Sequence, residues 1–89
     1  MTNTANMTQV EQPIRDFIAK NLLYTDSFGY ADDASLLREG IIDSLGVVEL
    51  VEFVQKQFGV TVDQQEVTPD NFDSVVKLAA YVRKKAAGA

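Results

Sequence analysis

Apolar residues recur at helical spacing in three stretches of the chain, and the first stretch predicts a helix over roughly 9–23. Thr8 and Glu11 have the spacing of a capping box at its start. Pro13 is tolerated only in a first turn, so the helix could instead begin nearer Gln12, with Pro13 as its first residue. The apolar positions of this helix are Val10, Ile14, Phe17, Ile18 and Leu22.

The second stretch predicts a helix that begins at Asp43 or Ser44 and ends near Phe58, where Gly59 can stop it. On a helix that turns about 100° per residue, five of its apolar side chains form one narrow stripe. We expect that stripe to face the core. It consists of Val47, Leu50, Val51, Val54 and Phe58.

Two apolar residues of the second helix, Leu45 and Val48, do not belong to the core stripe. They lie towards the opposite face together with Glu49, Glu52 and Lys56. Apolar side chains surrounded by acids suggest a docking surface for another protein. The ordinary alternative is that single exposed apolar residues are common on protein surfaces.

The third stretch predicts a helix over about 74–86, with Asp73 or Ser74 as its cap. Before it, Thr68 and Pro69 form an N-cap followed by a proline at the first helical position, which predicts a short helix. The expected buried stripe of the last helix is Val75, Leu78, Ala79 and Val82.

The long connection LYTDSFGYADDASLLREGII precedes the second helix, and SLLREG within it could form a helical turn that ends at Gly40. A strand at VTV would have nothing to pair with. The pattern therefore predicts an all-α fold, a small bundle of three main helices plus one short helix. Residues 1–7 are expected to be disordered, 8–86 to form a single domain and 87–89 to be frayed. Residues expected to pin the connection to the core are Leu36, Leu37, Ile41 and Ile42.

Composition narrows the classes of function. The chain has 89 residues, a net charge of −5, and neither cysteine nor histidine, so it lacks thiolate chemistry as well as the commonest general base and metal ligand. We therefore expect neither an enzyme nor a metal site, and Asp26, Asp32 and Asp33 lack the pattern of a calcium loop. The acidic charge argues against nucleic acid, and no apolar run is long enough for a membrane. The polar start MTNTANMT is no signal peptide, so we expect a soluble, cytoplasmic protein. We also expect it to be a monomer.

Ser44 has two interpretations. Serine before an apolar helical pattern is a typical N-cap, which would give it a purely structural role. Yet a helix N-terminus is also a natural seat for a phosphate ester, because its free N–H groups and positive dipole favour an anion. A long loop ends at this serine, so its hydroxyl should be reachable by an enzyme.

The stretch GIIDSLGVVELV, followed by FGV and TPDNFDSVVKLAAYV, resembles the acyl carrier proteins. The resemblance extends from about Val10 to Val82, and its most specific element is Asp43-Ser44-Leu45. It implies an acyl-carrier-like bundle in which a phosphopantetheinyl transferase attaches 4'-phosphopantetheine from coenzyme A to Ser44. The thiol of that arm would hold an acyl or aminoacyl group as a thioester. A loading ligase and downstream enzymes would be its further partners.

The resemblance also implies roles for the neighbours of Ser44. Asp43 would help the transferase to bind, through a cation, while also capping the helix. Leu45 and Val48 would form the apolar part of the partner-binding face, and Glu49 and Glu52 its acidic part. The acids could equally be ordinary solvated surface residues.

Two departures from the family pattern argue against service to the general fatty-acid enzymes, and the DSL form differs from the GGxS pattern of carrier domains in large peptide synthetases, so we favour a free-standing carrier with a dedicated pathway. Gly46 stands where many relatives have an acid, and QKQ at 55–57 replaces residues that are often acidic, so the face is less negative. The cargo could be a fatty, polyketide, amino or other acid. Phe53, Val62 and Tyr81 are candidates to line a cavity for it. The alternative function is an unmodified helical adaptor, which would use the same apolar pair and tolerate the loss of Ser44.

Overall fold

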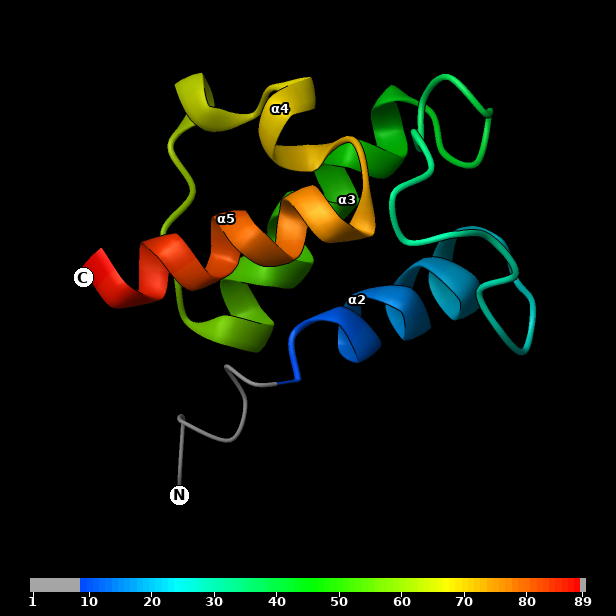
Figure 1. Ribbon diagram of the computed structural model, residues 1–89, viewed down its shortest axis with the longest axis horizontal. Coiled ribbons are helices and arrows are strands. Elements are labelled where there is room, and N and C mark those ends of the chain that lie inside the picture. Colours follow the sequence, from blue (N-terminus) through cyan, green and yellow to red (C-terminus); the bar gives the residue numbers. More distant parts are fainter. Residues whose placement is uncertain (1–8, 89) are drawn as a thin grey trace.

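A computed structural model of the protein describes residues 9–88, and every regular element among these residues is helical (Figure 1). This confirms the predicted all-α fold of three longer helical stretches and one short helix. The predicted disordered segment 1–7 and Thr8 of the predicted capping box lie outside the described residues. The elements are α2 Glu11–Phe17, the π-helical η1 Ile18–Leu22, α3 Ser44–Phe58, the 3-10 turn η2 Gln64–Glu66, α4 Pro69–Phe72 and α5 Val75–Gly88.

The first predicted helix is present as α2 followed directly by η1. It begins at Glu11, so Pro13 falls in the first turn, where a backbone N–H has no partner within the helix. The last turn is wider than an α-helix, because the Leu23 N–H donates to the Ile18 carbonyl at 2.9 Å. Hydrophobic spacing did not predict this widening.

The helix α3 has the predicted bounds. It ends where Gly59 adopts a left-handed conformation with φ of 70°, which glycine reaches without steric cost. Leu50 and Val54 of its apolar stripe are fully buried, and the other stripe residues pack against the core from partly buried positions. The predicted core face of this helix is therefore confirmed.

The caps of the last two helices differ in detail from the prediction. Thr68 precedes Pro69 as expected but forms no side-chain cap bond. Ser74 caps α5, because its Oγ accepts a hydrogen bond from the Lys77 N–H at 3.0 Å. Asp73 instead accepts bonds from the Leu37 N–H at 3.0 Å and from the Ser35 hydroxyl, which holds the long connection against the α4–α5 junction.

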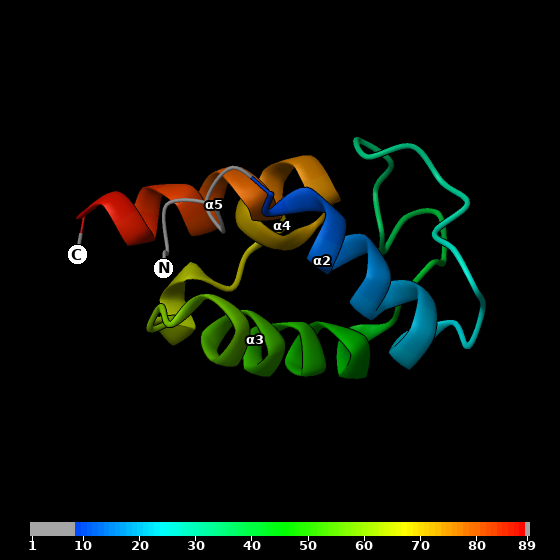
Figure 2. The same cartoon turned by 90° about the horizontal axis from the view of Figure 1, so that it is seen from below.

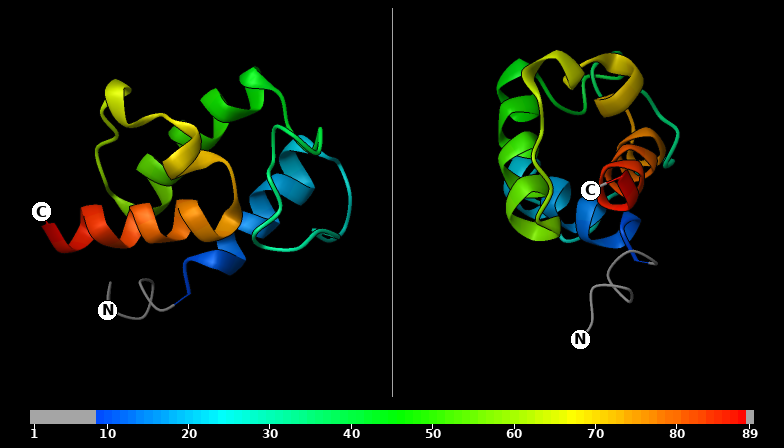
Figure 3. Two further views of the ribbon diagram at one scale, coloured as in Figure 1. Left: turned by 45° about the horizontal axis from the view of Figure 1, so that its top comes forward. Right: turned by 90° about the vertical axis from the view of Figure 1, so that its left-hand side faces the viewer.

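The four predicted buried residues of α5 are confirmed, since Val75, Leu78, Ala79 and Val82 have no exposed surface. This helix packs against α2, α3 and α4, and it extends two residues beyond the predicted end (Figure 2). Figure 3 shows the longer helices around a shared interior, with residues 23–43 crossing one end. Side chains from every helix except η2 fill that interior.

The connection is anchored by three of the four predicted residues: Leu36, Ile41 and Ile42 are buried. The prediction for Leu37 is wrong, because 45% of its surface is exposed. The reason is the turn over residues 36–40: the N–H groups of Ile41 and Ile42 both donate to the Leu36 carbonyl. Leu36 therefore sits on the inside of the turn, and its neighbour faces out.

Two long-range ion pairs join the first helix to the rest of the fold. Arg83 of α5 donates to both carboxylate oxygens of Glu11 at 2.7 and 2.8 Å. Arg15 donates through Nε to Asp32 at 2.7 Å, so this aspartate is held by a cation of the chain itself. The hydrogen bonds lower the pKa of both carboxyl groups below their usual range.

The three residues predicted as candidates to line a cargo cavity, Phe53, Val62 and Tyr81, make different contacts. Phe53 stacks on Phe17 with ring centroids 4.3 Å apart. Tyr81 is buried and donates to Glu66 Oε1 at 2.7 Å, while Val62 is partly buried at the edge of the core. All three belong to or pack against the one hydrophobic core, and their role as the lining of a cargo cavity stays a prediction. Among residues 9–88, no helix has both the length and the apolar character needed to cross a membrane.

Candidate functional site

The N-terminus of α3 is capped by Asp43. Its backbone is extended, with φ of −112° and ψ of −173°, and its Oδ1 accepts a hydrogen bond from the Gly46 N–H at 2.9 Å. This bond satisfies one of the four N–H groups that the first turn of a helix leaves without a partner. Of the two capping candidates that the sequence offers, the structure selects Asp43.

Ser44 is the first residue of the helix proper, and its side chain is exposed. Its hydroxyl forms no hydrogen bond within residues 9–88, and the backbone N–H groups of Ser44 and Leu45 likewise have no partner there. The positive end of the helix dipole lies at the same place. An exposed hydroxyl beside two available N–H donors fits a phosphate ester of the serine, such as the one that holds a phosphopantetheine arm.

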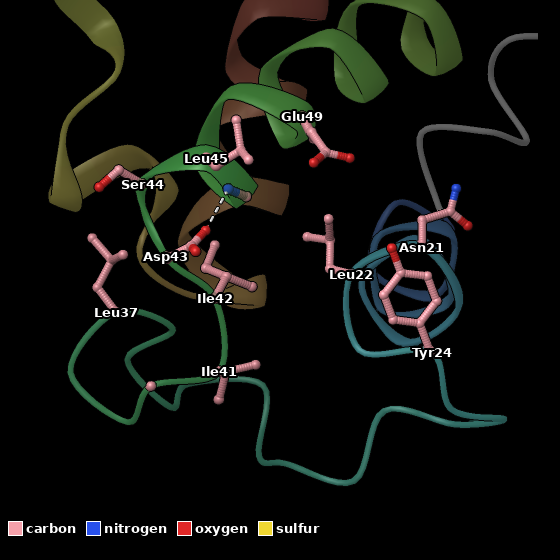
Figure 4. Close-up of a pocket in the computed structure, with 12 residues that line it drawn as sticks. Asn21, Leu22, Tyr24, Leu37, Ile41, Ile42, Asp43, Ser44, Leu45 and Glu49 are labelled. Atoms are coloured by element: carbon pink, nitrogen blue, oxygen red, sulfur yellow. Dashed lines mark hydrogen bonds between the residues drawn. The ribbon is translucent and has the colours of Figure 1, made fainter.

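An open cleft with a volume of about 610 Å³ lies beside the start of α3. In Figure 4, Leu22 and Tyr24 stand on one side of this space, and Leu37, Asp43 and Ser44 stand on the other. The first wall comes from the end of η1, and the second from the connection and the first turn of α3. The lining residues are Asn21, Leu22, Tyr24, Leu37, Gly40, Ile41, Ile42, Asp43, Ser44, Leu45, Gly46 and Glu49.

The residues predicted to form a partner-binding face share one exposed face of α3. Leu45 is 65% exposed and Val48 54% exposed, and Glu49 and Glu52 are exposed beside them. Glu49 lines both the cleft and a neighbouring groove of about 380 Å³, which also borders Glu52 and the Phe17–Phe53 pair. The structure thus places the four residues predicted for the partner-binding face on one exposed surface beside Ser44.

Gly46 has a packing role that the sequence did not reveal. It is buried, and a Cβ atom at this position would lie 3.0 Å from Ile42 Cβ and 3.6 Å from Leu22 Cδ1. Such a contact is too close for most side chains to accept without movement. Glycine therefore allows the first turn of α3 to approach Ile42 closely, in addition to leaving the helix without an acid there.

Sequence reasoning missed the wall of the cleft opposite Ser44. Tyr24 is 84% exposed and adopts φ of 57°, and Asn21 lies beside it at the cleft (Figure 4). A polar loop residue gives no periodic signal, so only the closing of the fold brings Tyr24 and Ser44 to one cleft. Leu37 was noticed, but as a core residue.

Comparisons with known proteins agree with this geometry. The family described as "Phosphopantetheine attachment site" matches residues 12–82. The D-alanyl carrier protein of Abiotrophia defectiva is 38% identical over 55 residues, which cover 62% of this chain and 70% of that protein. The probable acyl carrier protein PigG of Serratia sp. (strain ATCC 39006) is 28% identical over 75 residues, 84% of this chain and 86% of that one.

A solved chain has a similar fold. It comes from a structure described as "Crystal structure of FAD-dependent dehydrogenase", with a TM-score of 0.60, 38% identity, and coverage of 76% of this chain and 96% of that chain. The family match alone spans well over half of the 89 residues. The chain therefore belongs to the acyl carrier protein family and bears its cargo on a covalently attached 4'-phosphopantetheine group.

Proposed function

We propose that Ser44 is the residue to which the phosphopantetheine arm is attached. One observation carries this assignment: Ser44 is an exposed helix N-terminal serine whose cap is supplied by its neighbour Asp43. Its hydroxyl is thus not needed to hold the helix. Two N–H groups that have no partner among residues 9–88, those of Ser44 and Leu45, lie where the phosphate would sit.

In this reaction the Ser44 Oγ forms a bond to phosphorus of coenzyme A as the pyrophosphate P–O bond breaks. Adenosine bisphosphate leaves, and the hydroxyl proton passes to a base. We assign that base to the transferase, because histidine, the commonest general base, is absent from this chain and the Asp43 carboxylate already accepts the Gly46 N–H. Once attached, the arm supplies a thiol that holds the cargo as a thioester. The protein itself then positions and presents the cargo and catalyses no step.

The exposed face of α3 provides a surface for partner enzymes. Leu45 and Val48 offer apolar contact area, and Glu49 and Glu52 attract basic partner surfaces and speed the encounter. Asp43 serves the transferase as well as the helix, through a cation held at the carboxylate oxygen that does not accept the Gly46 bond. We expect the protein to act as a cytoplasmic monomer that binds neither nucleic acid nor membrane.

The cargo is an acyl or aminoacyl group within a dedicated pathway. Two relatives support this proposal, since one is named a D-alanyl carrier protein and the other a probable acyl carrier protein. The partners that follow are a phosphopantetheinyl transferase, a loading ligase and enzymes that process the thioester. The similar solved chain, described as part of an FAD-dependent dehydrogenase structure, suggests a flavin-dependent dehydrogenase as one processing enzyme to test.

Intact mass spectrometry tests the attachment. The protein is incubated with coenzyme A, magnesium and a broad-specificity phosphopantetheinyl transferase, with Ser44→Ala as the matched control. We expect the native chain to gain the mass of one phosphopantetheine and the variant to gain none. If the native chain gains nothing while the transferase modifies another carrier, Ser44 is not the attachment site and an adaptor role is favoured.

A further inference from the structure

Tyr24 has a backbone conformation that side chains disfavour. Its φ of 57° lies in the left-handed region, just beyond the end of η1, and a left-handed residue at the end of a helix is usually glycine. The Thr25 N–H closes the helix end by donating to the Ala19 carbonyl at 2.8 Å. The sequence therefore keeps a tyrosine where glycine would satisfy the backbone at lower cost, and such an outlier is a reason to look for function.

The fold does not use the Tyr24 side chain. The residue is 84% exposed, and within residues 9–88 its ring stacks on no other ring and its hydroxyl forms no hydrogen bond. Tyrosine is enriched at protein–protein interfaces, because it provides a large contact area and loses little conformational freedom. The side chain is thus available for another molecule.

Tyr24 and Ser44 line the same cleft from opposite walls (Figure 4). An enzyme that forms a bond to the Ser44 Oγ must bring its reacting atoms into contact with that oxygen. A stable interface buries about 800 Å² on each partner, equivalent to a circular patch roughly 16 Å in radius. The described part of the protein measures 32 × 28 × 19 Å, so a footprint centred on Ser44 extends across both walls of the cleft.

The cleft also indicates what the enzyme must present. Its apolar lining includes Leu22, Leu37 and Leu45, and carboxylates of Asp43 and Glu49 lie at its edge. The complementary surface is an apolar side chain flanked by basic groups. Enzymes that act at the far end of the arm need not contact Ser44, so the partner that must cover this cleft is the one that modifies the serine.

From these contacts we infer that the phosphopantetheinyl transferase docks across the cleft and that Tyr24 is a contact residue that sets its affinity for this carrier. This inference rests on the proposed modification of Ser44. Tyr24 does not touch the reacting atoms in this arrangement, so its loss should weaken binding and leave the chemical step intact.

The conformation of Tyr24 supplies a clean variant. Tyr24→Gly removes the ring and suits the left-handed backbone, so it should leave the fold at least as stable as the native one. Tyr30→Ala is the matched control, since Tyr30 is an exposed tyrosine of the same connection that does not line the cleft. Both variants are compared with the native protein by circular dichroism and thermal unfolding before kinetic measurement.

The experiment measures kcat and KM for the broad-specificity transferase acting on the native protein and both variants. We expect Tyr24→Gly to lower kcat/KM about fivefold or more, mainly through a higher KM, and Tyr30→Ala to stay within twofold of native. A Tyr24→Gly value within twofold of native, or a loss confined to kcat, overturns the docking proposal while leaving the Ser44 assignment intact. If the native chain itself is not modified, the proposed function fails and this inference fails with it.

Discussion

The cap at the start of α3 separates the structural and functional roles of two adjacent residues. Asp43 Oδ1 accepts the Gly46 N–H at 2.9 Å, and replacing Asp43 by alanine removes that acceptor. Loss of an N-cap costs about 1 kcal/mol, with values up to about 2 kcal/mol in favourable cases. The lost negative charge at the helix N-terminus is part of this cost. For a chain of 89 residues, a loss of about 1 kcal/mol lowers the melting temperature by roughly 4–8 °C.

Ser44→Ala should behave differently. The Ser44 hydroxyl forms no bond within residues 9–88, and alanine is the better helix former. We therefore expect the free energy of unfolding to change by less than about 0.5 kcal/mol. Asp43→Asn provides a further control, because an asparagine side chain caps as well as an aspartate while it removes the charge.

Urea unfolding of the three variants, followed by far-ultraviolet circular dichroism, measures these differences. The expected order of stability places Ser44→Ala with the native protein, Asp43→Asn slightly below, and Asp43→Ala clearly lowest. The assignment of the cap to Asp43 would be refuted if Ser44→Ala were as destabilising as Asp43→Ala. It would equally fail if Asp43→Ala unfolded at the same urea concentration as the native chain.

Two further predictions concern the core and the C-terminal half. Leu50 is fully buried, whereas Leu45 is 65% exposed. In urea unfolding, Leu50→Ala should therefore lower the free energy of unfolding by about 2–5 kcal/mol and Leu45→Ala by less than about 0.5 kcal/mol. Equal losses of stability would contradict the orientation of α3. The hydrogen bond from Tyr81, followed in size by the one from Lys85, lowers the pKa of Glu66 from 4.5 to about 2. The ionised Glu66 therefore stabilises the fold above pH 4.5, and this stabilisation is lost as the pH falls through about 2. In Tyr81→Phe, the pKa of Glu66 followed by NMR should rise towards 4.5, and an unchanged pKa would show that the hydrogen bond is unimportant.

Much of the fold could be predicted because hydrophobic spacing and helix punctuation agree along this chain. The start of α3 at Ser44 and its stop at Gly59 follow from a capping residue and a glycine that bracket one apolar stripe. The four buried positions of α5 follow from the same periodicity. Such local signals place the helices and their inner faces, and the order of the helices leaves few ways to pack them.

Features set by contacts between distant residues were not predictable. Leu37 lies in an apolar pair with Leu36, and only the turn over residues 36–40 decides which of the two faces inward. In the sequence, Gly46 is only a weak helix former. The structure shows that a Cβ atom on Gly46 would lie 3.0 Å from Ile42 Cβ, which gives glycine a packing role there. The choice between Ser74 and Asp73 as the cap of α5 depends on a hydrogen bond that the Leu37 N–H, far away in the sequence, donates to Asp73.

The candidate site shows the same division. Its α3 half, Ser44 with Leu45 and Val48, was predicted because it lies in one continuous motif on one helix face. The opposite wall of the cleft was not predicted, because only the path of the connection over residues 23–43 brings Tyr24 to the same cleft as Ser44. A single sequence carries no signal for two residues twenty positions apart that share a cleft without touching.

At the start of α3, Asp43 caps the helix while Ser44 is left for modification, and this arrangement has a consequence for the modified protein. If Ser44 were the cap, the oxygen that holds the first turn of the helix would also be the oxygen that is esterified, and each modification would change the cap bond itself. With the cap on Asp43, the hydroxyl of Ser44 can be esterified while the 2.9 Å bond to Gly46 remains. A phosphate on Ser44 would also lie near the positive end of the helix dipole and near the N–H groups of Ser44 and Leu45, which have no partner in the described part of the chain. The fold should therefore accept the arm without loss of stability, which fits the proposal that partner enzymes bind the same α3 surface before and after loading.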